Sequence, residues 1–249
     1  MAGAEGDAAG RLGRFIGADR RSELHGLRQT EAESHMQERV AVLTGDLVKS
    51  TKTSRAHVEA VFDQLKAADA RLRDDLGLPQ DPPLERFRGD GWQALMRSTR
   101  HVLRASLVFS AAARSVDTKT ATRIAVGVGA AEQLDQAGLG ASDGPAFRVS
   151  GRGLETMKRS ARLTLVLDSD RDDAVWAQSA FMLAGAAAHG WSRPQAEVLQ
   201  HLLLPKPPTQ AELGDQFGIT QQSVQDRFDN AAGGVLLEVL EHMEAHDGL

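Results

Sequence analysis

The stretch VAVLTGDLVKST, residues 40–51, decides how the fold of this chain is interpreted. An apolar run, typical of a buried β-strand, ends there at Gly45-Asp46 and is followed by small hydroxyl residues. A second stretch, RFRGDGWQALM at residues 86–96, is predicted as strand, tight turn and strand, with Asp90 in the turn. Two carboxylates at the ends of neighbouring strands form the usual hard-oxygen site for Mg²⁺ that carries phosphates. The alternative is that each aspartate only favours a turn, as aspartate often does beside glycine.

The composition is that of a globular protein. With 249 residues, of which 41% are hydrophobic, the chain can form one large or two modest domains. It has no cysteine, which excludes disulfides, cysteine-ligated zinc and a thiol nucleophile. No stretch approaches the ~18 uninterrupted apolar residues of a membrane span, and residues 1–10 lack the basic and apolar regions of a signal peptide. We therefore expect a cytoplasmic protein without a membrane partner.

The charge of the chain is negative and unevenly distributed. A net charge of −5 argues against non-specific binding of polyanions, and an aromatic content of 4% argues against a stacking platform for single-stranded nucleic acid. Residues 191–249 contain three Lys or Arg residues and nine Asp or Glu residues, which gives a local charge of −6.

Four segments are expected along the chain. Residues 1–37 are rich in Gly, Ala, Arg and Glu and predict a mobile tail with at most one short helix. Met36 is an alternative start, because the first strand begins a few residues later. Residues 38–170 are expected to form an α+β domain, residues 171–190 a linking helix, and residues 191–249 a small all-helical domain.

The α+β segment alternates strands and helices. Strands are expected at residues 39–44, 84–87, 92–96, 122–128 and 163–167, and helices at residues 54–76, 99–116 and 145–159. Ser54 is the expected N-cap of the first helix, whose apolar stripe consists of Val58, Val61, Phe62, Leu65, Ala68 and Leu72. The order βαββαβ predicts a ferredoxin-like palm, in which helices back a sheet with antiparallel pairs.

The last segment contains TQAELGDQFGITQQSV, residues 209–224, which matches a helix-turn-helix with Gly218 in the turn. Its second helix carries side chains of the kind that read base edges in the major groove, namely Thr220, Gln221, Gln222, Ser223, Gln225 and Arg227. Phosphate contacts supply most of the affinity for DNA, and the local charge of −6, with Asp226 and Asp229 on this helix, opposes them. A protein-docking or purely structural helix pair is the alternative.

Three motifs resemble signatures of class III nucleotide cyclases. The stretch from Asp46 to Thr51 looks like their first metal motif, and RFRGDG at residues 86–91 resembles their hairpin motif. GPAFRVSGR at residues 144–152 is similar to their helix with an asparagine and an arginine.

Further motifs resemble the SatD-like family more closely, which comprises bacterial proteins of poorly defined function with a palm-like domain. They are TRIAVGVG at residues 122–129, DGPAF at residues 143–147 and the terminal helix-turn-helix. The resemblance covers residues 39–230.

The strand ends are expected to bind a metal ion and phosphate. Asp46 and Asp90 would hold Mg²⁺ or Mn²⁺, with the carbonyl oxygen of Leu47 as a further ligand. Backbone N–H groups ahead of the first helix would form a nest for phosphate oxygens, from Val48, Lys49, Ser50 and Thr51. The Lys49 side chain would screen the terminal phosphates.

The helix and hairpin motifs carry three further expected site residues and depart from the cyclase pattern. Arg152 would neutralise charge that builds on the α-phosphate, as the resemblance implies. Arg148 stands at the asparagine position, where it could tighten phosphate binding but could not orient the ribose as an amide does. Arg86 places a forked guanidinium where the cyclases have a lysine, and Ala130 stands at the position of a usual glutamate. These departures favour binding over turnover.

Active class III sites generally form across a homodimer, so a homodimer is expected.

The sequence therefore predicts an intracellular regulator. A cyclase-like domain would bind a divalent cation and a nucleoside triphosphate or cyclic nucleotide, and the helix-turn-helix would relay that state to DNA or a protein partner. The first alternative is an active nucleotidyl cyclase or transferase that makes a cyclic or oligomeric nucleotide. The second is a non-catalytic scaffold that binds neither ligand.

Overall fold

The structure is a computed structural model that describes residues 39–48, 54–78, 81–87, 89–135, 138–169 and 174–246. The predicted tail, residues 1–37, and the predicted phosphate ligands Lys49, Ser50 and Thr51 lie outside these residues. Within the described ranges, no helix has both the length and the apolar character needed to cross a membrane.

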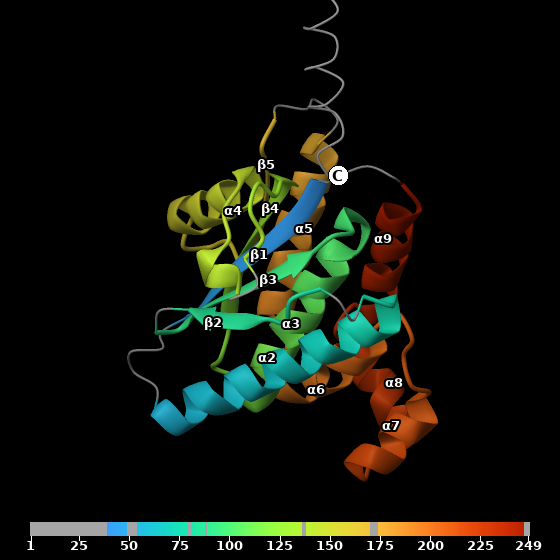
Figure 1. The fold of residues 1–249 in the computed structure, drawn as a ribbon. Coiled ribbons are helices and arrows are strands. Elements are labelled where there is room, and N and C mark those ends of the chain that lie inside the picture. The colour runs from blue at the N-terminus through green and yellow to red at the C-terminus, as the bar shows by residue number, and fades with distance from the viewer. Residues whose placement is uncertain are drawn as a thin grey trace, which may run out of the picture. The chain divides into compact units, whose positions relative to one another are not determined.

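A five-stranded sheet organises the described fold (Figure 1). Its strands are β1 (Arg39–Leu47), β2 (Glu85–Phe87), β3 (Gly91–Met96), β4 (Thr122–Ala130) and β5 (Leu163–Leu167). They lie in the order β2-β3-β1-β4-β5, and neighbours are antiparallel except for β4 and β5, which are parallel. The first four strands thus have the order and direction of a split βαβ arrangement. The predicted α+β class is confirmed.

Helices cover both faces of the sheet. They are α2 (Arg55–Leu76) and α3 (Val102–Val116) on one face and α4 (Pro145–Thr156) on the other, with 3₁₀ turns at η2 (Thr99–His101) and η3 (Leu139–Ala141). α2 begins as predicted, because the Ser54 hydroxyl accepts a hydrogen bond from the backbone N–H of His57. It ends at Gly77, which has the left-handed φ of 69° that glycine adopts without strain. All six residues of its predicted apolar stripe are buried.

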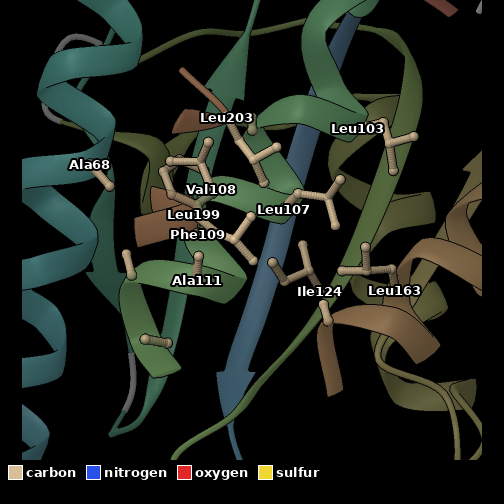
Figure 2. Close-up of a cluster of buried hydrophobic side chains, with 14 of the residues drawn as sticks. Ala68, Leu103, Leu107, Val108, Phe109, Ala111, Ile124, Leu163, Leu199 and Leu203 are labelled. Atoms are coloured by element: carbon tan, nitrogen blue, oxygen red, sulfur yellow. The ribbon is translucent and has the colours of Figure 1, made fainter. Parts of the chain in front are cut away.

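α3 is buried on nearly every side. Leu107 lies in the core beside the sheet, and Ala105 and Ala112 are buried as well. The reason is that α6 (Arg193–Leu202), a helix of the C-terminal segment, packs against α3 on the side away from the sheet. Figure 2 shows this cluster, in which Leu199 and Leu203 of the C-terminal segment join Leu107 in one hydrophobic core.

Five helices lie among the described residues after β5. They are α5 (Val175–His189), α6 (Arg193–Leu202), α7 (Gln210–Phe217), α8 (Gln221–Asp229) and α9 (Gly233–Ala245). α6, α7 and α8 each begin at a hydroxyl N-cap whose oxygen accepts a hydrogen bond from the N–H three residues on, at Ser192, Thr209 and Thr220. α7 and α8 pack together across a tight turn at Gly218, where φ is 65°. The predicted helix pair and its turn are therefore present, whereas its use in DNA binding stays a proposal.

Arg104 of α3 links the C-terminal helices to the helices on the sheet. Its buried guanidinium donates hydrogen bonds of 2.6 and 2.8 Å to Glu244 of α9 and one of 2.8 Å to the carbonyl of Leu203. A buried charge requires partners of this kind, because an unpaired one is strongly destabilising. One hydrophobic core thus includes residues on both sides of the expected boundaries at 170 and 190, and the described residues from Arg39 to His246 belong to one compact unit. The predicted division at these two positions stays a prediction.

Candidate functional site

The register of the sheet places the two predicted aspartates at one edge. Asp46 of β1 lies opposite Gly91 of β3, and Gly91 directly follows Asp90 in the hairpin turn. On its other side, Asp46 lies opposite Arg123 of β4. The central strand β1 therefore ends between the turn that contains Asp90 and the strand that contains the positively charged Arg123.

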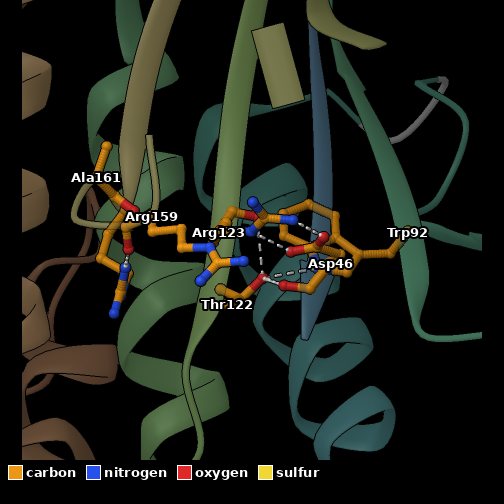
Figure 3. Close-up of polar contacts among 7 residues, drawn as sticks. Asp46, Trp92, Thr122, Arg123, Arg159 and Ala161 are labelled. Atoms are coloured by element: carbon orange, nitrogen blue, oxygen red, sulfur yellow. Dashed lines mark hydrogen bonds and ion pairs between the residues drawn. The ribbon is translucent and has the colours of Figure 1, made fainter. Parts of the chain in front are cut away.

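A buried tryptophan holds these strand ends together. The indole N–H of Trp92 donates a 3.1 Å hydrogen bond to the Thr122 hydroxyl, which donates in turn to the carbonyl oxygen of Asp46 at 2.8 Å (Figure 3). A Cβ atom added at Gly45 would lie 2.7 Å from Nε1 of Trp92 and closer still to two of its ring carbons. The glycine of the Gly45-Asp46 motif is therefore required by the Trp92 ring, which occupies the space of a side chain there.

Asp46 is paired with Arg123 in this structure. Nε of Arg123 donates to Oδ1 of Asp46 at 2.9 Å, and Nη2 donates to Oδ2 (Figure 3). The hydrogen bond to Asp46 raises the pKa of Arg123, burial opposes this, and the charges of Asp46 and Asp90 raise it further. Both aspartates thus act on one guanidinium that is 28% exposed.

The sequence did not identify Arg123 as a site residue. Its strand, TRIAVGVG, signals a buried strand, but nothing in it reveals that Arg123 stands opposite Asp46. That neighbour relation depends on the register between β1 and β4, which are far apart in the chain.

The side chains at this edge fit a cation that arrives with phosphates better than a resident metal. The described residues contain no group of three or more His, Cys, Asp or Glu side chains placed to hold an ion. Mg²⁺ commonly takes only one or two carboxylates and completes its shell with phosphate oxygens and water. Asp46 and Asp90 fit that pattern, provided that Asp46 gives up or shares its bonds with Arg123.

The backbone nest predicted at residues 48–51 is wrong at its first position. The N–H of Val48 donates a 2.8 Å hydrogen bond to the carbonyl of Ala121, so it is not available to a phosphate. The other three nest residues lie outside the described part of the chain. The Leu47 carbonyl stays a predicted metal ligand; Leu47 itself ends β1 opposite Thr122 and is buried.

Arg86 lies on the other face of the sheet from the Asp46 carboxylate. Arg86 is paired with Trp92, which packs on the α2 and α3 side of the sheet. Trp92 is in turn paired with Gly45, and the next residue, Asp46, faces the opposite side because successive side chains of a strand alternate. Its guanidinium donates to Glu59 of α2 at 2.8 Å and to the carbonyl of Gly89 at 2.6 Å. Arg86 thus ties α2 to the turn before Asp90, and its predicted contact with a nucleotide stays a prediction.

The structure does not bring Arg148 to the aspartates within one chain. Arg148 pairs with Glu132 at 3.3 Å and with Asp143 at 3.2 Å, beyond the far end of β4 from Arg123. The seven residue steps along β4 correspond to about 23 Å. Within one chain, Arg148 therefore lies far from Asp46, and its expected role at the site stays a prediction.

Arg152, one helical turn after Arg148, is exposed on α4. Its contact with phosphate stays a prediction. A second copy of the chain would have to supply Arg148 to a shared site, as the predicted homodimer implies.

Two of the predicted DNA contacts serve to start α8. The Thr220 hydroxyl accepts the backbone N–H of Ser223 at 3.1 Å, and the two hydroxyl groups lie 2.9 Å apart. Gln221 and Gln222 follow on the exposed side of the helix.

The remaining α8 residues of the prediction are engaged within the protein. Gln225 accepts a hydrogen bond from Gln210 of α7 at 2.6 Å and donates one to Asp229 at 2.7 Å. Arg227 is turned toward α6, where its Nη1 lies 3.8 Å from Glu197. The exposed side of α8 therefore combines glutamines with Asp226 and Asp229 rather than with a cation.

Comparisons with known proteins add a distant structural likeness. No protein-family model matches the sequence, and no curated protein matches it. Among solved structures, the crystal structure of the guanylyl cyclase Cya2 is similar at 15% sequence identity, over 51% of this chain and 74% of that chain, with a TM-score of 0.37. A likeness this distant carries no argument about function, and the SatD-like assignment stays a resemblance of sequence.

The contact between Gly45 and Trp92 generates a stability prediction. Gly45→Ala should lower the free energy of unfolding by about 1–3 kcal/mol, because the added methyl group overlaps a fully buried indole. Urea unfolding followed by circular dichroism measures this. Gly140→Ala is the matched control, since a Cβ there meets nothing within 4 Å. Equal stability of the two variants would show that the Trp92 ring does not constrain β1.

Proposed function

We propose that this chain is a regulator that binds a nucleotide together with its divalent cation at the ends of β1 and β3. The observation that carries the proposal is the register that sets Asp46 beside the turn of Asp90 and opposite Arg123. Asp46 and Asp90 would hold Mg²⁺ or Mn²⁺, which would supply charge neutralisation for the phosphates. A nucleoside triphosphate or a cyclic nucleotide is the proposed ligand.

Arg123 has two roles in this proposal. Without a ligand, it neutralises Asp46 through a forked pair of hydrogen bonds. When a nucleotide and its cation bind, Asp46 would turn to the cation, and the same guanidinium would be free to donate to phosphate oxygens. Binding would then exchange one set of ionic partners for another, with no charge left unpaired.

Binding is favoured over turnover. The ion pairs of Arg148 keep it away from Asp46, and Ala130 offers no carboxylate. An active nucleotidyl cyclase or transferase is the alternative, and it would require a second copy to complete the site. A scaffold that binds neither ligand is the remaining alternative, and the binding experiment below would reveal it.

The α7–α8 pair would pass the bound state to a partner. Its exposed side carries Asp226 and Asp229, and the segment as a whole has a local charge of −6. Because phosphate contacts provide most of the affinity for DNA, this charge favours a protein partner over DNA.

The central prediction is that Asp46→Asn or Asp90→Asn abolishes binding of ATP or GTP in the presence of Mn²⁺. The amide keeps the shape of the carboxylate but removes the charge that the cation requires. Isothermal titration calorimetry measures the binding, and pyrophosphate release in the same samples distinguishes turnover from binding. Asp63→Asn, a change on the exposed side of α2, is the matched control and should bind as the native chain does. If the native chain binds neither nucleotide, the scaffold interpretation replaces the proposal.

A second prediction concerns DNA. The native chain should bind duplex DNA weakly at most, with affinity that falls steeply above ~0.1 M salt. If α8 enters the major groove, Asp226→Lys should strengthen non-specific binding and Gln222→Ala should relax specificity more than it lowers affinity. Fluorescence anisotropy at two salt concentrations measures both. If Asp226→Lys binds DNA no more tightly than the native chain does, DNA is excluded as the partner and a protein partner remains.

A further inference from the structure

A cavity of about 770 Å³ opens between the helices on the sheet and the C-terminal helices. α2 and α3 form one wall through Ala60, Gln64, Ser115 and Val116, and α6, α7 and α8 form the other. This volume lies within the ~300–1,000 Å³ typical of small-molecule sites. The cavity is separate from the strand ends, because none of its lining residues belongs to the sheet.

Cations are concentrated in this cavity. Residues 191–249 contain only three Lys or Arg residues, and two of them, Arg193 and Arg227, line it. One acid, Glu197, lies between them, with its carboxylate oxygens 2.9 Å from Nε of Arg193 and 3.8 Å from Nη1 of Arg227. An otherwise acidic segment thus presents an excess of positive charge at one place.

A third arginine lies next to a residue that lines the cavity. Arg71 of α2 contacts the cavity residue His201, with 3.3 Å between Nη1 and Nδ1. Burial first, and then the charge of Arg71, lower the pKa of His201 to about 4. His201 is therefore neutral at pH 7, and it can serve as a hydrogen-bonding group without a charge of its own.

We infer that this cavity binds a small ligand with a phosphate group, anchored by Arg193 and Arg227. Guanidinium groups match phosphate oxygens with paired hydrogen bonds. The 3.8 Å contact leaves Arg227 only loosely held by Glu197, so a phosphate can take this partner's place. Around the two anchors, neutral groups can satisfy the rest of a polar ligand; they are Gln64, Ser115, Gln200, His201 and Gln216.

This site is independent of the nucleotide site proposed at the strand ends. The binding experiment is therefore arranged so that the strand-end site does not contribute to the measured affinity. Binding of inorganic phosphate, AMP and adenosine to the full chain is measured by calorimetry in EDTA, so that no divalent cation is available. The measurements are repeated with Arg123→Gln, which removes the guanidinium that could bind phosphate at the strand ends. Phosphate and AMP should bind and adenosine should not, and Arg123→Gln should leave the affinities unchanged, whatever the outcome for the strand ends.

Two charge variants test the anchors. Arg227→Gln should weaken AMP binding about tenfold or more, since it removes a charge-assisted hydrogen bond. Glu197→Gln should strengthen AMP binding, because the competing carboxylate is gone. The control is Lys206→Gln, which alters the third cation of the segment outside the cavity and should bind as the native chain does. Circular dichroism confirms that each variant is folded.

Three results would overturn the inference. The first is that neither phosphate nor AMP binds at a ligand concentration of ~10 mM, which is far above the dissociation constants of functional anion sites. The second is adenosine binding as tightly as AMP, which would identify a site for the nucleoside alone. The third is an equal loss of affinity in Lys206→Gln and Arg227→Gln, which would indicate a general charge effect.

Discussion

The candidate site depends on one contact, that of the Trp92 ring with the backbone at Gly45. The ring fills the space in which β1 lacks a side chain, and its N–H reaches the Thr122 hydroxyl, which binds the carbonyl of Asp46. One side chain thus fixes β1, β3 and β4 at the same edge of the sheet. The contact thus supports the backbone pairing of β1 and β4 that sets the carboxylate of Asp46 beside the guanidinium of Arg123.

The described helices after the sheet share a continuous hydrophobic core with it. α3 lies between the sheet and α6, and Arg104 binds both Glu244 and the end of α6. A change in the packing of α3 must therefore be accommodated by the C-terminal helices, since closely packed interiors transmit strain. This continuity gives the proposed regulator a physical route between its two ends.

Local signals in the sequence predicted most of the fold. The N-cap at Ser54 and the turn at Gly218 are short-range patterns, and each lies where the pattern placed it. The paired aspartates were predicted because both follow apolar strands. Arg123 was missed because its partner is set by register across 77 residues. Arg148 was placed by resemblance alone, and the spacing within a helix does not reveal which end of the sheet it faces.

We expect Arg123 and a metal ion to compete for Asp46. The most direct test is a titration of the native chain and of Arg123→Gln with Mn²⁺ alone, followed by electron paramagnetic resonance. Mn²⁺ should bind the native chain weakly and Arg123→Gln at least about tenfold more tightly, and adding Asp46→Asn should abolish this gain. Equal Mn²⁺ affinity in the native chain and in Arg123→Gln would contradict this expectation.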